Sequence, residues 1–378
     1  MAEVEIANFP FTTIKPNVGV AFVKTDCAEK YFGVKCNPRI GYCIDGKRFV
    51  PVRLMDVAGL VPGAHKGLGM GSQFLDDLRQ AHVLIHVVDI SGSVNEKGEP
   101  VEPLSYDPLN DVLFLEEELD YWYTGILKKG WDKLARQVQQ EKGQLHKVLG
   151  KQLTGLGIDE KMIERTITKM KLDAEKPINW TEEQLFQLAR NLRIESKPMI
   201  IAANKIDVQG AEKNFARLKE KFPEYVVVSC SAESEVALKL AAKNNVIKYI
   251  PGASDFEIIS PKKLSDSQKN ALEFIRENVV KKYSSTGVQE VLDTAVFKYL
   301  KYVAVFPGGV NKLQDQHGNV LPDCFLLPQN STALDFAYKL HTDLGKNFVR
   351  AIDVKTKRTV GKEHILTNGD VIEIITSK

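Results

Sequence analysis

Residues 197–207 read KPMIIAANKID, an apolar run that ends in Asn-Lys-Ile-Asp. The run predicts a buried strand, so the N-K-x-D motif stands at the carboxyl end of that strand. A carboxylate such as Asp207 accepts two hydrogen bonds from the N1–H and the exocyclic amine of guanine, an edge that adenine does not offer. Asn204 and Lys205 would brace the neighbouring loops and cover the base. The motif indicates guanine recognition, although four residues alone also fit a simple turn that ends a strand.

Two further motifs accompany N-K-x-D in a fixed order. Upstream, Asp56 and Gly59 form a D-x-x-G that follows the β-rich run RFVPVRLMDV. Downstream, the run EYVVVS leads into Ser231 and Ala232, whose backbone N–H groups would meet the guanine O6. D-x-x-G, N-K-x-D and S-A after successive strands is the sequence plan of a GTPase domain. The alternation of strands with helices around these motifs predicts a doubly wound α/β sheet.

The phosphate-binding loop of this plan has no match in the sequence. The nearest spacing match to G-x-x-x-x-G-K-[ST] runs from Gly41 to Lys47, and Arg48 follows it in place of Ser or Thr. Asp45-Gly46 lies between two β-rich runs, and no helical pattern follows. We therefore predict a β-hairpin turn at this point instead of a Walker A motif.

The composition is that of a soluble globular protein with two or three domains: 378 residues, 43% apolar, 26% charged, with a net charge of +2. This balance provides no overall field toward DNA or a membrane, and no apolar run approaches the roughly 20 residues of a membrane helix. The five cysteines form no C-x-x-C pair, and we interpret them as reduced thiols in a cytoplasmic protein. Cys27, Cys36 and Cys43 lack paired metal spacing and a nearby His, so the sequence does not predict a zinc site.

The patterns divide the chain into a first GTPase part, an inserted helical domain, a second GTPase part and a small α+β domain, at 1–115, 116–195, 196–302 and 303–378. In the insert, helical spacing over several turns predicts one long helix from about Leu113 to Leu153, with a second helix returning beside it as a hairpin. In the last domain, Thr332 is the predicted N-cap of a helix, with Asp335 three residues on. Asn368-Gly369 between two β runs predicts a β-hairpin.

Several longer stretches resemble a known family. They are EIANFPFTTIKPNVGV at 5–20, DVAGLVPGAHKGLGMGSQFLDDLRQAHVLIHVVD at 56–89 and STGVQEV at 285–291. Together with the C-terminal end, they resemble the YchF/Obg-like branch of the Obg-related P-loop GTPases, nearly end to end. The resemblance implies a P-loop NTPase-type sheet, N-terminally incomplete, with an inserted helical hairpin and a C-terminal β-grasp-like TGS domain.

By comparison with that family, roughly 20 to 25 residues that carry a central strand and the Walker A motif are missing before Asn8. A sheet without its central strand would leave two inner edges unpaired. We therefore expect Met1 to be a start inside a longer gene product, and the alternative is a degenerate relative.

The resemblance also implies a magnesium site and a hydrolytic site. Thr12 or Thr13 in switch I would coordinate Mg²⁺, Asp56 would hold the ion through a water, and the N–H of Gly59 would touch the γ-phosphate. Ras-type GTPases place a glutamine directly after that glycine, whereas Leu60 stands here. We therefore expect slow intrinsic hydrolysis or a substitute catalytic group.

Three histidines are of the type that serves catalysis or metal binding. His65 is the candidate substitute for the glutamine, and an ordinary exposed loop histidine is the alternative interpretation. His82 and His86 lie in the run HVLIHVVD, which indicates a buried strand. Residues four apart on a strand are separated by about 13 Å, too far to share an ion. We therefore expect both to be core histidines.

Two classes of function follow. The first is a GTP-binding and GTP-hydrolysing switch that acts with the ribosome or RNA through the insert and the TGS domain. Some family members use ATP, with the lysine and aspartate of N-K-x-D replaced, and the retained Lys205 and Asp207 favour GTP. The second is a nucleotide-independent ribosome- or RNA-binding module. Seven Lys or Arg against two acids within 128–151 fit an RNA contact and equally fit a solvated helix face.

Overall fold

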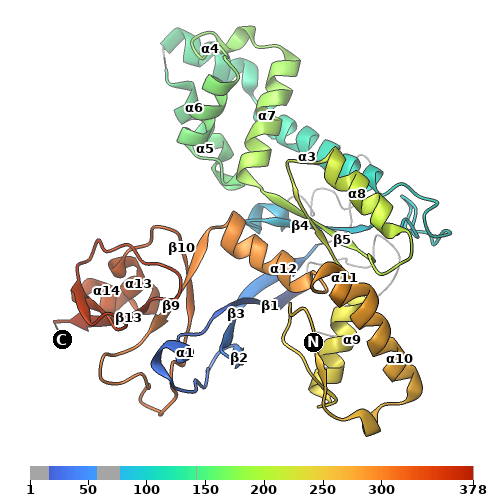
Figure 1. Cartoon of the computed structure of the whole chain (residues 1–378). Coiled ribbons are helices and arrows are strands. Elements are labelled where there is room, and N and C mark those ends of the chain that lie inside the picture. The colour runs from blue at the N-terminus through green and yellow to red at the C-terminus, as the bar shows by residue number, and fades with distance from the viewer. Residues whose placement is uncertain (1–16, 58–76, 142, 378) are drawn as a thin grey trace. The chain divides into compact units, whose positions relative to one another are not determined.

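The computed structural model describes residues 17–57, 77–141 and 143–377 (Figure 1). The chain forms two compact units. The first consists mainly of Met55–Ile247 and Ser254–Val288, and the second of Gly19–Leu54, Lys248–Ala253 and Gln289–Lys378. Among the described residues, no helix is both long and apolar enough to cross a lipid bilayer.

A parallel three-stranded sheet with the order β4-β5-β6 forms the centre of the first unit. Its strands are β4 (Leu84–Asp89), β5 (Met199–Asn204) and β6 (Val226–Ser229). Asp89 lies opposite Asn204, and Ala203 lies opposite Ser229, so the carboxyl ends of the three strands share one edge. The first five residues of β5 are buried, as expected for a strand covered on both faces. The predicted α/β sheet is confirmed.

The helices of this sheet follow its strands. They are α8 (Ala211–Lys221) after β5 and α9 (Ala232–Lys243) after β6. Leu218 of α8 is fully buried and joins the apolar residues of β4 and β5 in one core, with Val88 and Ile201. The chain then passes through these elements: β7 (Ile247–Lys248), β8 (Glu257–Ile258), η4 (Pro261–Lys263), α10 (Asp266–Ile275), the π-helical η5 (Arg276–Val280) and α11 (Lys281–Tyr283).

β4 forms an edge of the parallel sheet within the described part of the chain. Its sequence, LIHVVD, is that of an interior strand, yet the side chain of Val87 is 62% exposed. Edge strands usually carry charge or proline to discourage pairing, and β4 carries neither before its final residue. This edge is therefore chemically suited to pair with another strand.

The insert is drawn in colours from cyan (α3) to yellow-green (α7) in Figure 1 and is a bundle of helices rather than one long helix with a partner. It contains α3 (Leu109–Lys128), α4 (Trp131–Glu141), α5 (Leu145–Leu153), η2 (Thr154–Leu156), α6 (Glu160–Lys169), η3 (Pro177–Asn179) and α7 (Glu182–Ser196). The helix that packs along α3 is α7, and not the predicted return helix at 160–172, which corresponds to α6. The single long helix was wrong because Gly130 has a φ of +76°, which ends α3 and redirects the chain.

The helices of the insert share one apolar core. Trp131 and Trp180 stack in it with ring centroids 5.4 Å apart, and Leu149 and Ile163 are fully buried beside them. The apolar spacing that predicted a helix therefore identifies the core-facing residues correctly, although the helix is broken.

The second unit begins with a small sheet of order β1-β3-β2. Its elements are β1 (Asn17–Asp26), α1 (Glu29–Phe32), β2 (Tyr42–Ile44) and β3 (Lys47–Asp56). Ile44 pairs with Lys47 across Asp45 and Gly46, whose φ values are 49° and 74°. Positive φ at both central residues is the signature of a type I′ turn, so the predicted hairpin at Asp45-Gly46 is confirmed.

After α12 (Val288–Asp293) and the π-helical η6 (Thr294–Tyr299), the chain forms a five-stranded sheet of order β10-β9-β13-β11-β12. Its strands are β9 (Tyr302–Pro307), β10 (Phe325–Pro328), β11 (Phe348–Asp353), β12 (Arg358–Val360) and β13 (Val371–Thr376), with the helices α13 (Ala333–Leu340) and α14 (Thr342–Lys346). Thr332 and Asp335 form the predicted cap at the start of α13, as a reciprocal capping box.

The predicted hairpin at Asn368-Gly369 was wrong. The turn is present, but the residues before it are not a strand, and β13 pairs with β11 and in parallel with β9. The side chain of Asn368 accepts a hydrogen bond from the backbone N–H of Ala304, and the N–H of Gly369 donates to the Ala304 carbonyl. The turn is therefore fixed by β9 and not by a partner strand of its own.

Candidate nucleotide-binding site

The base-recognition motifs meet at the shared carboxyl edge of β4, β5 and β6. Asn204 is the last residue of β5, and its side-chain oxygen accepts a hydrogen bond of 3.0 Å from the backbone N–H of Ala232. The backbone N–H of Ile206 donates to the Cys230 carbonyl, 3.1 Å away. The loops that follow β5 and β6 are thereby held together, so the structure brings the N-K-x-D and S-A motifs into one site.

Lys205 braces the loop after β4. Its φ of 63° turns the chain sharply at the end of β5, and its ammonium group lies 2.9 Å from an Asp89 carboxylate oxygen and 3.0 Å from the Ser93 hydroxyl. Burial pushes the pKa of Asp89 upward, but hydrogen bonds from Ser91 and Lys205 outweigh it, and the pKa lies below its usual value. The sequence analysis missed Asp89 and Ser93. The signal for Asp89 was its place at the end of a strand, equivalent to that of Asn204.

Asp207 has a half-buried side chain that makes no hydrogen bond or ion pair with the described residues. Both carboxylate oxygens are therefore available for a ligand. The loop that carries Asp207 is itself held in place, because the N–H of Val208 donates to the Lys205 carbonyl at 3.2 Å. A fixed backbone with an available carboxylate is the arrangement that two N–H donors of a purine edge require.

The backbone N–H groups of Ser231 and Ala232 are already engaged within the protein. Ser231 donates to the Thr286 carbonyl at 2.9 Å, and Ala232 donates to Asn204. The hydroxyl of Ser231 also caps α9 by accepting from Ser234. A contact of either N–H with the guanine O6 would require that one of these bonds be exchanged.

The segment Ser285-Thr286-Gly287 is a third part of the site, and the sequence analysis gave it no role. The Thr286 hydroxyl donates to Glu235 at 2.5 Å, which fixes the segment against α9. Gly287 has a φ of +80°, and a Cβ there would lie 1.8 Å from the Ser229 carbonyl oxygen. Only glycine fits at this position, so the tripeptide S-T-G was the available signal.

Of the residues predicted for the phosphate end, Asp56 is the one that the structure describes. Asp56 is the last residue of β3, in the sheet with β1 and β2, and its side chain is exposed. An exposed carboxylate at a strand end is a hard oxygen donor of the kind that Mg²⁺ takes, directly or through water. Outside the described residues lie Thr12, Thr13, Gly59, Leu60 and His65.

The two strand histidines differ in environment. His82 lies before β4 and is exposed, so its assignment to the core was wrong, because the strand begins only at Leu84. His86 lies on β4, partly buried, and its Nδ1 atom is buried without a hydrogen-bond partner among the described residues. Burial lowers the pKa of His86 to about 4, so its ring is neutral at physiological pH.

The fold and this site define a GTPase-like protein with a C-terminal TGS domain, and family models agree. The 50S ribosome-binding GTPase model matches residues 1–115, and the Obg-like GTPase YGR210-like, G4 motif-containing domain matches residues 202–309. The TGS domain model matches residues 315–376.

Individual relatives agree as well. The uncharacterized GTP-binding protein MJ1332 of Methanocaldococcus jannaschii is 52% identical over 374 residues, which cover 99% of this chain and 93% of the relative. The crystal structure of a GTP binding protein from Pyrococcus horikoshii OT3 has a TM-score of 0.73 and 38% identity, and covers 95% of this chain and 93% of the other. The ribosome-binding ATPase YchF of Bacillus subtilis is 29% identical over 254 residues, 62% of this chain and 61% of that protein. The chain belongs to the YchF/Obg-like family of Obg-related P-loop GTPases.

Proposed function

We propose that this protein binds GTP at the carboxyl edge of β4, β5 and β6, and that it hydrolyses GTP with Mg²⁺ as a molecular switch. The observation that carries the proposal is the carboxylate of Asp207, which makes no hydrogen bond or ion pair with the described residues. It lies in the loop after β5, which a 3.0 Å hydrogen bond between Asn204 and Ala232 joins to the loop after β6. The carboxylate selects guanine because it accepts from two donors on one edge of the base. Relatives named as GTP-binding proteins support this assignment.

An ATP-binding role is the second candidate, because the Bacillus subtilis relative is named a ribosome-binding ATPase. Adenine presents an acceptor where guanine presents N1–H, and it lacks the exocyclic amine at C2. An ionised Asp207 would therefore repel the adenine edge, and its retention in this chain favours GTP.

For the phosphate end, the proposed ligands remain Thr12, Thr13, Asp56 and Gly59. Mg²⁺, when bound, neutralises charge that develops on the transferred phosphoryl group. Thr12 or Thr13 would contribute a hydroxyl oxygen, and Asp56 would hold a water of the ion. With Leu60 in the position after Gly59, hydrolysis is proposed to be slow, or to depend on a substitute group such as His65.

The proposed partner is the ribosome, and the proposed location is the cytoplasm. The family model that matches residues 1–115 is described as a 50S ribosome-binding GTPase, and the Bacillus subtilis relative is named ribosome-binding. Within 128–151, the Lys and Arg side chains that the structure describes are exposed, which allows contact with RNA phosphates. A switch of this kind would order its nucleotide-binding loops around the γ-phosphate and relax them after hydrolysis.

The substitution Asp207→Asn tests the base assignment. Asn replaces one acceptor with a donor, so we expect GTP affinity to fall on the order of 100-fold or more while affinity for xanthosine triphosphate rises. Xanthine carries a carbonyl at C2, where guanine carries an amine, and the Asn amide can donate to it. The measurement is equilibrium binding of labelled nucleotides to a form of the protein that binds GTP. Asp266→Asn, on the exposed first turn of α10, is the control and should change neither affinity. Unchanged GTP affinity in Asp207→Asn would contradict the assignment.

A further inference from the structure

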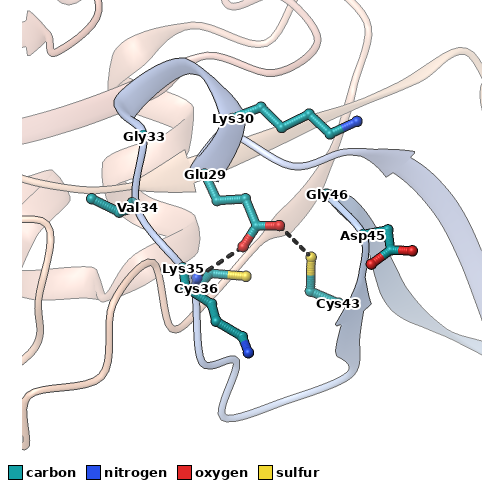
Figure 2. A pocket seen from close by; sticks show the side chains of 9 residues that line it. All are labelled: Glu29, Lys30, Gly33, Val34, Lys35, Cys36, Cys43, Asp45 and Gly46. Carbon is teal, nitrogen blue, oxygen red and sulfur yellow. Dashed lines mark hydrogen bonds between the residues drawn. The ribbon is translucent and has the colours of Figure 1, made fainter.

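Four side chains with metal-binding atoms gather in the second unit. Cys27 follows β1, Glu29 begins α1, Cys36 lies in the loop after α1, and Cys43 lies on β2. Their sulfur and carboxylate oxygen atoms all lie within 4.8 Å of one another. Figure 2 shows Glu29 between Cys36 and Cys43 at the wall of a pocket of about 380 Å³. The sequence analysis did not predict this cluster, because the loop after α1 brings together cysteines that have no paired spacing.

Two distances within the cluster are close to the edges of a tetrahedral zinc site, and the others do not exceed 4.8 Å. Ligands about 2.3 Å (sulfur) and about 2.0 Å (oxygen) from a tetrahedral centre lie about 3.8 Å apart for a sulfur pair and about 3.5 Å apart for sulfur and oxygen. The sulfur atoms of Cys27 and Cys36 are 3.6 Å apart. The sulfur of Cys43 lies 3.4 Å from Oε1 of Glu29. Little movement of the side chains is needed to accommodate an ion.

The carboxylate of Glu29 is oriented by the backbone. Its Oε2 atom accepts a hydrogen bond of 2.8 Å from the N–H of Cys36, so Oε1 is left on the side of Cys43 (Figure 2). Such a hydrogen bond to the outer oxygen of a carboxylate is a common support for a metal ligand.

Arg48 provides a second observation in favour of a metal site, independent of the distances between the ligands. Its side chain is fully buried, and its Nε and Nη1 atoms have no hydrogen-bond partner among the described residues. Arg48 lies on β3 directly opposite Cys43 of β2 in the antiparallel pair, which makes it a neighbour of the cluster. A divalent ion with three thiolates and one carboxylate carries a net charge of −2, and a buried cation with unused donors offsets part of that charge.

We propose that Cys27, Cys36, Cys43 and Glu29 bind a single Zn²⁺ ion in a closed, structural site. Zn²⁺ prefers sulfur ligands and tetrahedral geometry, whereas Mg²⁺ and Ca²⁺ prefer oxygen. Binding replaces the three thiol protons, which are released to solvent, and no group is oxidised or reduced. The ion would fix the end of β1, the helix α1 and the strand β2 to one another.

The test is the zinc content of the full chain, purified without a metal-affinity tag, measured by mass spectrometry of the metal. We expect about one zinc per chain in the wild type and almost none in Cys36→Ser and Cys43→Ser. Glu29→Gln should weaken zinc binding by more than about 10-fold. Cys324→Ser is the matched control, because Cys324 packs in the same apolar cluster but is not one of the four ligands, and this variant should keep its zinc.

A second measurement avoids dependence on the folding of the cysteine variants. The wild-type chain is depleted with a chelator and titrated with Co²⁺, and thiolate-to-cobalt charge-transfer absorption should grow to about one Co²⁺ per chain. Absence of both zinc and this absorption in the folded wild type would overturn the proposal. So would full zinc content in Cys43→Ser, or a Cys27–Cys36 disulfide in protein purified with reductant. None of these results depends on nucleotide binding.

Discussion

The imidazole of His86 is a partly buried weak base whose Nδ1 atom is buried with no partner among the described residues, and this makes it a source of acid sensitivity. Its pKa is lowered by burial from 6.5 to about 4. Between these two values the unfolded chain binds a proton at this residue and the folded chain does not. Stability therefore falls as the pH drops from 6.5 toward 4, and the contribution is fully present above 6.5.

We predict that His86→Leu removes this part of the acid sensitivity. The free energy of unfolding of the wild type should fall on the order of 2–3 kcal/mol more than that of the variant across this pH range. Urea unfolding at a pH above 6.5 and at a pH just above 4 measures the difference. His82→Leu is the control, because His82 is exposed and should leave the dependence unchanged. Equal pH dependence in His86→Leu and the wild type would contradict the prediction.

The residues of the base site were predictable where a motif follows a strand. Asn204, Lys205 and Asp207 come directly after an apolar run, and the run locates them at the carboxyl edge of the sheet. Thr286 could not be predicted in the same way, because its role depends on a contact with Glu235, 51 residues away in the chain. The cysteine cluster was missed for a similar reason, since loop geometry and not spacing brings the thiols together.

Between helices, a buried polar cluster joins the two long helices of the insert. Arg193 of α7 is 1% exposed and donates to Asp120 of α3 at 2.6 Å. Its other nitrogens lie near Glu116 and Tyr225, and Tyr225 donates to Glu116 at 2.5 Å. Charges buried in this way are stable only as a set, because a partner left alone retains its full desolvation cost.

We predict that Arg193→Met destabilises the protein by about 3–5 kcal/mol. The loss should lie toward the lower end of this range, because Arg190 lies 3.7 Å from Asp120 and would still partly neutralise its carboxylate. Arg165→Met is the matched control, because Arg165 pairs with Glu195 at the exposed surface. That variant should lose little stability, because ion pairs at the exposed surface contribute little. Chemical denaturation followed by circular dichroism compares the two. A loss in Arg193→Met no larger than in the control would contradict the account.

The exposed basic residues of α4 give a test of RNA contact. We predict that reversing two of them, Lys133→Glu with Arg136→Glu, weakens ribosome binding and lowers its salt dependence, because each charge that contacts a phosphate releases counterions. Lys221→Glu with Lys243→Glu reverses two exposed charges, one on α8 and one on α9, as a control. Co-sedimentation with ribosomes over a salt series measures both. Equal losses of ribosome binding in the two double variants would mean that only the overall charge matters, which would contradict a specific contact through α4. Unchanged binding in both variants would also contradict the proposed contact.

An Asp-Gly or Asn-Gly turn predicted a hairpin correctly only where the segments on its two sides pair with each other. Asp45-Gly46 forms its hairpin because Ile44 and Lys47 pair across it. Asn368-Gly369 has the same sequence signature but is bound by the backbone of Ala304, so its strand pairs elsewhere. The break between α3 and α4 at Gly130 could not be predicted from the sequence pattern, because the apolar helical spacing continues on both sides of it.

Over the whole chain, the base half of the nucleotide site is assembled and the proposed phosphate half lies mostly in residues outside the described ranges. Asn204, Lys205 and Asp207 are held by contacts among described residues. Asp56 is placed on β3, whereas Thr12, Thr13 and Gly59 are not described. Both halves fall within matched family models: residues 1–115 contain the motifs of the phosphate end, and residues 202–309 contain the base motifs. The central claim is therefore about the base: this chain selects guanine through Asp207.

The most direct test is equilibrium titration with labelled GTP and ATP in the presence of Mg²⁺. It uses the 378-residue chain and a form extended upstream to include a Walker A motif. We predict that the extended form binds GTP on the order of 100-fold more tightly than ATP, and that the 378-residue chain keeps the same preference at lower affinity. Equal or tighter binding of ATP would contradict guanine selection. Failure of both folded forms to bind either nucleotide, with ribosome binding intact, would instead identify a nucleotide-independent docking protein.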